Sequence, residues 1–331
     1  MPKTVWVQLI LNSYSRIFGV VLFGIILWRF DAISTFSRFR QIDWFLTIGA
    51  VAQIVIVHTF KVSRWKFILD KLGINRSFKS CYCVYLTGIF LGIVTPGRIG
   101  DFVKVLYLKR EGVSIKKALL ASFVDKASDI FLVLILVSMF SAWFAEFFIV
   151  SASYIYILVA GVTVLTMVLV RSYGQDTVKE KIISAIGYVG GRNFARIFGE
   201  GLRQFLAGLR TFSISEILRL GLFTFLAWFV YTGSVFTFSL ALGLKIPFIS
   251  AIFFIIAAAS VYVLIPISVA GIGTRDLTLI LLFPMLGYME KSAILFSAII
   301  LLVYILEALF GFICWCIKPI YLSQIKSMMQ D

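Results

Sequence analysis

The chain has 331 residues, of which 61% are hydrophobic and only 14% are charged. A soluble domain is about 45–50% apolar, so this composition excludes an ordinary soluble protein and indicates an all-α integral membrane protein. The formal net charge of +15 does not predict nucleic-acid binding, because the basic residues fall between hydrophobic segments, where the positive-inside rule places them.

A bilayer span needs about 20 mostly apolar residues. The chain contains eight hydrophobic segments, and six of them have that length: 6–28, 43–62, 117–140, 149–170, 220–241 and 292–316. No small-residue cleavage site follows the first segment, so we expect a retained helix and not a signal peptide. We interpret residues 1–331 as a single transmembrane domain.

The other two hydrophobic segments are interrupted. The segment 80–95 ends at Pro96-Gly97-Arg98 and the short segment 102–108 follows, while 248–265 ends at Pro266 and the Gly271/Gly273 break, with 277–286 beyond it. An irregular backbone at membrane depth is tolerated only beside protein or water. We therefore expect two re-entrant helical hairpins whose breaks lie inside the protein.

The same residue pattern recurs at the two breaks. The first break has the sequence Gly97-Arg98-Ile99-Gly100-Asp101, and it is followed by Gly112, Lys116, Ala118 and Ser122. The second has the sequence Gly271-Ile272-Gly273-Thr274-Arg275-Asp276, and it is followed by Gly287, Lys291, Ala293 and Ser297. The spacing from the Asp to each of these later residues is the same in both. This pattern predicts an internal duplication, with repeat 1 at about 43–140 and repeat 2 at about 220–316. The alternative is a chance match within a sequence of low compositional complexity.

The distribution of basic residues predicts the orientation. The connections 63–79 and 171–219 are rich in Lys and Arg, whereas 141–148 contains neither. The positive-inside rule then puts the basic connections and both termini on the cytoplasmic side of a cell (inner) membrane. The two hairpins enter from opposite sides in this arrangement, so the repeats are inverted.

The connection 171–219 has an amphipathic pattern. Apolar residues recur at helical spacing from Phe194, while Arg196, Arg203 and Arg210 are seven residues apart on another face. We expect a cytoplasmic amphipathic helix whose arginines contact anionic lipid headgroups. A basic linker packed on the helix bundle is the alternative.

Three charged residues lie within the apolar run that begins at Ala118: Asp125, Lys126 and Asp129. At about 1.5 Å per residue they are roughly 12–18 Å beyond Lys117, near the middle of a ~30 Å hydrocarbon core. A charge there costs at least about 2.5–3.5 kcal/mol, so the three must face protein or water and pair. Lys126 reaches Asp129 at i,i+3. They form either an ion pair that fixes helix packing or a site for a headgroup or a proton.

Each glycine-rich break carries an arginine. The planar guanidinium groups of Arg98 and Arg275 suit bidentate phosphate binding, and Gly97, Gly271 and Gly273 allow a headgroup to approach the backbone. Asp101 and Asp276 open the following half-helices, and we expect them to cap exposed N–H groups.

Several kinds of chemistry find no support in the sequence. It has no P-loop and no His-Glu-x-x-His or Gly-x-Ser-x-Gly motif, so we expect no catalytic residue, no cofactor and no ATP-driven pumping by this chain. We expect no metal site, because the close cysteine pairs lie in apolar segments and His58 is the one histidine. His58 is expected near the cytoplasmic interface, and Arg64-Trp65-Lys66 is interpreted as an interfacial anchor.

The chain resembles the membrane region of bacterial lysylphosphatidylglycerol synthases. The resemblance rests on Thr95-Pro96-Gly97-Arg98-Ile99-Gly100-Asp101, Lys109-Arg110-Glu111-Gly112, the helix from Ala121 to Asp129, the break from Leu264 to Asp276, and Arg64-Trp65. It departs where the family usually has Glu-Arg in place of Asp125-Lys126, Glu in place of Asp276, and often an Arg in the last helix, near Tyr304 and Glu307. The family's membrane region flips lipids and a soluble aminoacyl-transferase domain follows it. Since this chain ends at Asp331, we expect no lysyl transfer.

We therefore expect translocation of a phospholipid or a polyprenyl-linked lipid between leaflets. The alternatives are a secondary transporter for a small anionic solute, a membrane-embedded transferase acting on lipids, and a non-catalytic partner of a lipid or glycan biosynthetic enzyme. Each of these functions is compatible with a homo-oligomer.

Overall fold

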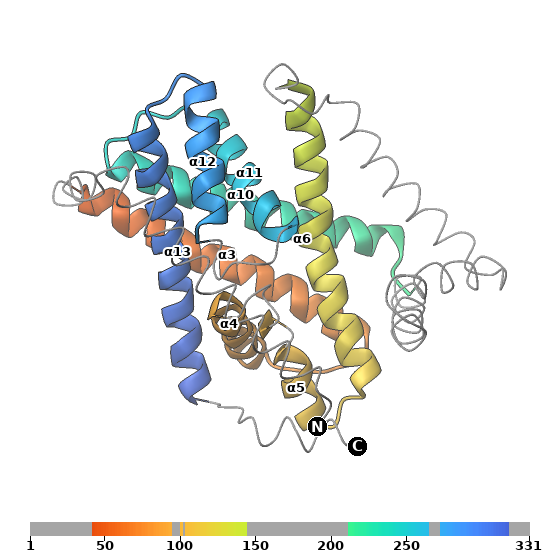
Figure 1. Cartoon of the computed structure of the whole chain (residues 1–331). Coiled ribbons are helices and arrows are strands. Elements are labelled where there is room, and N and C mark those ends of the chain that lie inside the picture. Colours follow the sequence, from red (N-terminus) through yellow and green to blue (C-terminus); the bar gives the residue numbers. More distant parts are fainter. Residues whose placement is uncertain (1–41, 95–99, 102, 144–210, 265–271, 318–331) are drawn as a thin grey trace, which may run out of the picture.

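The computed structural model describes residues 42–94, 100–101, 103–143, 211–264 and 272–317. Within these ranges the chain forms helices and no strand (Figure 1). The predicted spans 6–28 and 149–170, the arginines Arg196, Arg203 and Arg210, and most of both breaks lie outside the described residues.

The helices follow the predicted hydrophobic segments. They are α3 (Trp44–Lys71), α4 (Phe78–Val94), α5 (Val103–Arg110), α6 (Ile115–Trp143), α10 (Ile214–Ala241), α11 (Phe248–Leu264), α12 (Thr274–Met285) and α13 (Glu290–Ile317). By length and composition, α3, α10 and α13 are able to cross a membrane. Each interrupted segment consists of two helices, α4 with α5 and α11 with α12, so the predicted helix–break–helix pattern is present. Whether these pairs are re-entrant stays a prediction.

The first two helices of the predicted repeats match in length, and α3 and α10 also match in their ends. α3 and α10 each have 28 residues, and α4 and α11 each have 17. Side chains cap the first pair, since Asp43 accepts from the Leu46 N–H and Ser213 forms a capping box with Glu216. In both cases a glycine with positive φ lies two residues beyond the last helical residue. The φ is 74° at Gly73 and 70° at Gly243, a conformation that favours glycine.

The corresponding helices α3 and α10 run antiparallel. The start of α3 meets the end of α10 where the Asp43 N–H donates to the Ala241 carbonyl at 3.0 Å. The Ser234 hydroxyl donates to the Ala50 carbonyl at 2.9 Å, and Lys71 pairs with Glu216 at 2.8 Å. An antiparallel relation between corresponding helices is the geometry that an inverted repeat requires.

Each of the remaining helix contacts in one predicted repeat has a counterpart in the other. α4 packs on α13 and α11 packs on α6, while α5 lies on α6 and α12 lies on α13. The α4–α13 contact is close, because a Cβ at Gly311 would overlap the Leu86 carbonyl and the Cβ of Phe90.

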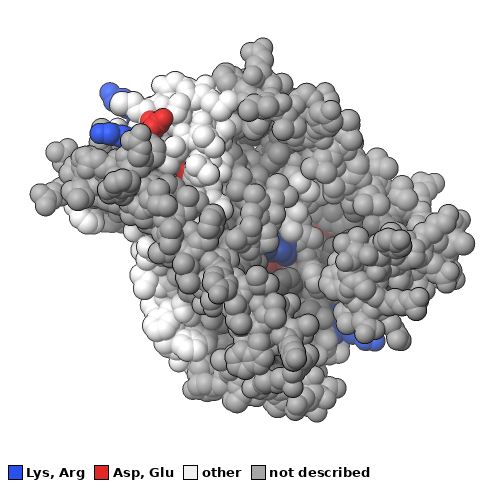
Figure 2. Space-filling model, in the orientation of Figure 1, with Lys and Arg blue, Asp and Glu red and all other residues white. Residues whose placement is uncertain are grey.

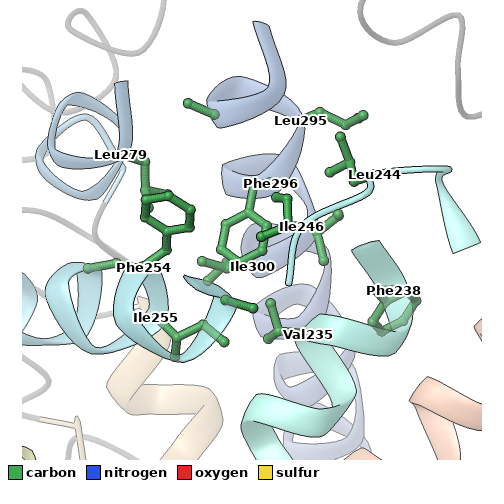
Figure 3. Packing of buried hydrophobic residues seen from close by; sticks show 14 of the residues in the cluster. Val235, Phe238, Leu244, Ile246, Phe254, Ile255, Leu279, Leu295, Phe296 and Ile300 are labelled. Atoms are coloured by element: carbon green, nitrogen blue, oxygen red, sulfur yellow. The ribbon is translucent and has the colours of Figure 1, made fainter. Parts of the chain in front are cut away.

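Two apolar clusters fill the space between the helices. In one of them the rings of Phe254 and Phe283 stack with centroids 3.9 Å apart, and Phe296 of α13 packs against both. Figure 3 shows Phe254 and Phe296 within this cluster. The second cluster surrounds Trp65 and Leu108. Together they join the hairpin helices to α3, α6, α10 and α13.

Large apolar side chains also cover the outside of the described helices. On α3, α10, α12 and α13 they include Phe45, Ile48, Leu218, Phe225, Phe229, Leu281, Phe312 and Ile313. On the face in Figure 2, the described charged side chains appear only in small groups. The exposed apolar side chains suit contact with lipid rather than water.

Candidate functional site

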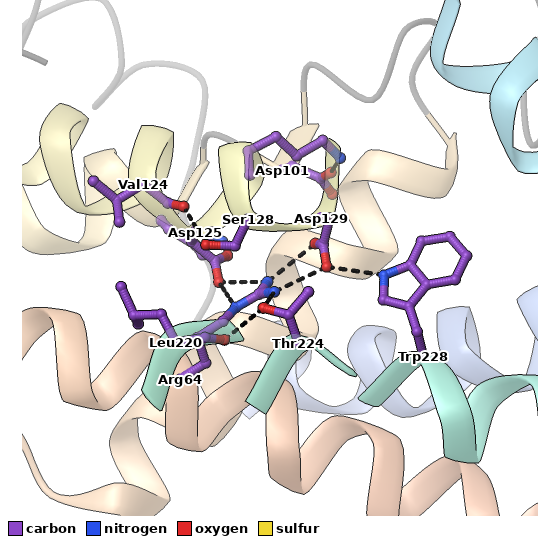
Figure 4. A network of polar contacts seen from close by, with 11 residues as sticks. Arg64, Asp101, Val124, Asp125, Ser128, Asp129, Leu220, Thr224 and Trp228 are labelled. Atoms are coloured by element: carbon purple, nitrogen blue, oxygen red, sulfur yellow. Dashed lines mark hydrogen bonds and ion pairs between the residues drawn. The ribbon is translucent and has the colours of Figure 1, made fainter. Parts of the chain in front are cut away.

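Arg64 of α3 is the centre of a buried polar network between α3, α6 and α10 (Figure 4). Its side chain is 0% exposed. Its Nε donates to Asp125 Oδ1 at 2.9 Å, and Nη1 and Nη2 donate to the two carboxylate oxygens of Asp129 at 2.9 and 3.0 Å. Nη1 also donates to the Thr224 hydroxyl at 2.9 Å. One guanidinium therefore joins three helices.

Lys104 of the short helix α5 completes the inner part of the network. Its Nζ lies 2.6 Å from Asp125 Oδ2, so Asp125 accepts from two cations. The ammonium also lies 4.3 Å from the ring centre of Tyr85 and 5.6 Å from that of Trp65. Aromatic faces stabilise a cation that has been removed from water.

The outer part of the network is more open. Lys126 Nζ donates to Asp101 Oδ2 at 2.7 Å, and these side chains are 30% and 14% exposed. Asp129 is 22% exposed on its side chain and accepts from the Trp228 indole N–H at 3.2 Å. The network thus extends from buried Arg64 to partly accessible groups at Lys126, Asp101 and Asp129.

Among the described residues of this network, three cations face three carboxylates. Arg64, Lys104 and Lys126 face Asp101, Asp125 and Asp129, with N–O distances from 2.6 to 2.9 Å. Burial of an ion pair costs desolvation energy that good geometry only offsets, so such a network is weak evidence of a gain in stability. Polar groups kept in an apolar bundle at this cost are by default a candidate functional site.

A second buried group surrounds Arg275. Arg275 is 2% exposed, its Nη2 lies 2.9 Å from Asp276 Oδ1, and its Nε donates to the Ser297 hydroxyl at 3.0 Å. Ser297 in turn donates to Asp276. Asp276 Oδ2 accepts from the Gly273 N–H at 2.7 Å, which caps α12 as the sequence predicts.

The predicted site residues fall into three groups. Asp125, Lys126 and Asp129 lie in the Arg64 network, Arg275 and Gly273 lie in the second group, and Gly97, Arg98 and Gly271 lie outside the described residues. Asp101 accepts from Lys126, an interaction that the sequence analysis did not anticipate, since it paired Lys126 with Asp129. In the part of the chain that the structure describes, no cluster of His, Cys, Asp and Glu suits a metal ion.

Four members of the network were not predicted from the sequence: Arg64, Lys104, Thr224 and Trp228. The interpretation of Arg64 and Trp65 as an interfacial anchor is wrong, because both side chains are fully buried between helices. His58 is also buried, and it faces Glu307 of α13. Its predicted depth near the cytoplasmic interface stays a prediction. Charge balance was the available signal, since two aspartates at i,i+4 with one lysine on their own helix require a further cation from elsewhere.

Comparison with known proteins agrees with the resemblance. The family model "Lysylphosphatidylglycerol synthase TM region" matches residues 14–311. A UPF0104 membrane protein of Pyrococcus horikoshii is 25% identical over 300 residues, which cover 84% of this chain and 88% of that protein. No solved structure matches the chain.

Proposed function

The chain belongs to the lysylphosphatidylglycerol synthase membrane-region family, and on that premise we propose that it translocates a phospholipid or a lipid-linked precursor between membrane leaflets. The headgroup passes along the Arg64 network while the acyl chains stay in the bilayer. The observation that carries this proposal is the open edge of the network, where Lys126 and Asp101 are partly exposed.

The charges at this edge suit a lipid headgroup. A lipid phosphate competes with Asp101 for Lys126, and an amine or hydroxyl on the headgroup competes with Lys126 for Asp101 or Asp129. Arg64 and Lys104 lie behind this edge and keep the aspartates in place without contacting the lipid. Arg98 and Arg275, from the two breaks, are the proposed phosphate ligands on the rest of the path.

The architecture in the bilayer follows from the repeats. We infer inverted repeats at about 43–140 and 220–316, with α4–α5 and α11–α12 as hairpins that enter from opposite faces. The antiparallel relation of α3 and α10 supports this arrangement. The basic connections and both termini face the cytoplasm of a cell membrane, and Arg196, Arg203 and Arg210 contact anionic headgroups there.

On this proposal the chain is a transporter and not an enzyme, and lysyl transfer is not part of its activity. The rival functions are transport of a small anionic solute, chemical modification of a lipid, and support of a separate biosynthetic enzyme. Each predicts a different product in a purified system, so one assay separates them.

The test is translocation of fluorescent lipids with anionic, zwitterionic and neutral headgroups in proteoliposomes, with the free headgroup phosphates as soluble competitors. We expect at least one lipid to cross faster than in protein-free vesicles and to be recovered unaltered. Uptake of a free headgroup without lipid movement supports a solute transporter, an altered lipid supports an enzyme, and no movement of either kind contradicts the proposal.

A further inference from the structure

A buried polar pair apart from the Arg64 network and the Arg275 group lies on α3 and α13, and it involves the chain's one histidine. His58 and Glu307 are 1% and 4% exposed, and His58 Nε2 lies 3.8 Å from Glu307 Oε1. Within the described part of the chain, neither ring nitrogen of His58 has a hydrogen-bond partner. A buried polar group without a hydrogen bond costs about 1–3 kcal/mol, so the fold retains this histidine at an energetic cost.

This pair differs from the other buried carboxylates in the nature of its cation. Asp125, Asp129 and Asp276 each lie 2.8 or 2.9 Å from an arginine, which is permanently charged. A proton on any of them would weaken an existing ion pair. Among the described residues, the ion-pair partner of Glu307 is instead a histidine, which carries a charge only after it binds a proton. The pair therefore gains an attractive contact when a proton arrives.

Two ionisable side chains act on the pair directly, Lys61 of α3 on His58 and Tyr231 of α10 with Glu307. Further out, Tyr231 also interacts with Tyr304 of α13 and with Arg275 of α12, and the Arg275 guanidinium lies 5.9 Å from the Tyr304 ring. The Lys61 ammonium lies 6.0 Å from the Tyr231 ring, and Tyr231 interacts with both Tyr304 and Glu307.

We propose that His58 and Glu307 form a proton-binding site and that lipid translocation responds to a proton gradient through it. The second half of this proposal rests on the proposed function. The pair binds one proton from water, held as an O–H on Glu307 that donates to His58 Nε2, or as an N–H on His58 that donates to Glu307. Release returns the same proton to water, so no other reactant is needed.

The pair is connected to the Arg64 network along two helices. On α3, His58 and Arg64 are about 9 Å apart along the helix axis, with Lys61 between them. On α10, the Trp228 ring lies 6.0 Å from the Tyr231 ring, and the same indole donates to Asp129. A change of charge at Glu307 thus acts on Tyr231, whose ring lies beside Trp228, the donor to Asp129 in the outer part of the network.

The first test uses the fact that the chain has one histidine. With ¹⁵N-labelled histidine, the nuclear magnetic resonance spectrum of the full chain in lipid nanodiscs reports His58 alone. We expect its Nε2 shift to change with pH, because the ring either takes the proton or accepts a hydrogen bond from protonated Glu307, and we expect Glu307→Gln to abolish that change. A shift that is constant wherever the protein stays folded overturns the proton site, as does the same titration in both proteins.

The second test measures lipid translocation in proteoliposomes with and without an imposed pH difference. We expect the gradient to change the wild-type rate by about fivefold, the low end of coupling between two sites, and we expect no response in Glu307→Gln. Lys66→Gln is the matched control, since Lys66 pairs with Asp70 on an exposed part of α3 and should keep the response. A wild-type rate that ignores the gradient overturns the coupling.

The two tests separate the two proposals. If the His58 resonance titrates through Glu307 while no lipid moves, the proposed function fails and the proton site stands. If lipid moves but the resonance does not titrate, the proposed function stands and the proton site fails.

Discussion

Arg64 and Asp129 form a two-point ion pair between α3 and α6, with Nη1 2.9 Å from Oδ1 and Nη2 3.0 Å from Oδ2. Two parallel contacts fix both side chains in one plane, and a lysine ammonium cannot reproduce them. The same guanidinium binds Asp125 one turn earlier on α6. It therefore separates two carboxylates that would otherwise repel each other at i,i+4.

We predict that Arg64→Ala destabilises the protein by about 3–5 kcal/mol, because it leaves two buried aspartates with too few cations. Arg64→Lys should recover only part of this loss. The measurement is thermal unfolding in detergent at constant pH. Lys66→Ala is the control, and loss of its exposed pair should cost about 0–1 kcal/mol. Equal midpoints for Arg64→Ala and the control would show that the network does not hold the fold.

The Lys126–Asp101 pair should affect transport more than stability. Because Lys126 is partly exposed, we predict that Lys126→Gln lowers the translocation rate of an anionic lipid while the unfolding midpoint changes little. Lys126→Arg, which keeps the charge and gains the fork that the family usually has at this position, should retain or raise the rate. The matched control is Lys71→Gln, which breaks a surface pair with Glu216. A Lys126→Gln protein that loses stability, but whose folded fraction translocates lipid at the wild-type rate, would contradict this assignment.

The two break arginines should behave differently. Arg275→Ala removes the cation beside buried Asp276 and a donor to Ser297, so we expect loss of both stability and transport. Arg98→Ala should slow transport of anionic lipids, with the headgroup panel as the measurement and Lys as a partial substitute. Asp101→Asn should slow transport less than Arg98→Ala does. Unchanged rates for every lipid in folded Arg98→Ala would remove Arg98 from the site.

The contact between α4 and α13 can be tested at Gly311. A methyl group there overlaps the Leu86 carbonyl and Phe90, so we predict that Gly311→Ala costs about 1–3 kcal/mol through overpacking. Gly221→Ala on α10 is the control, because no heavy atom lies within 4 Å of its added Cβ. It should stabilise its helix by up to about 1 kcal/mol. A Gly311→Ala protein as stable as the control would mean that the two helices are farther apart.

The sequence was sufficient to predict the helices but not the partners of the buried charges. Apolar segments broken by glycine, proline and charge predicted α6, α13 and both interrupted pairs close to their observed bounds, because helix formation depends on local composition and caps. The prediction ended α3 at 62 and began α10 at 220, whereas α3 continues to Lys71 and α10 begins at Ile214. Arg64 reaches α6 across a long sequence separation, and no local pattern distinguishes it from an interfacial arginine. Lys126 likewise prefers Asp101 on another segment, since tertiary packing and not helical spacing determines which carboxylate is within reach.

The most direct measurement is the initial translocation rate of a fluorescent anionic phospholipid in proteoliposomes that contain the wild-type protein, Lys126→Gln, Lys71→Gln or no protein. The account predicts a rate above the protein-free value for wild type and Lys71→Gln, and a rate near that value for folded Lys126→Gln. A rate for folded wild-type protein equal to that of protein-free vesicles, or a rate for folded Lys126→Gln equal to the wild-type rate, would contradict it.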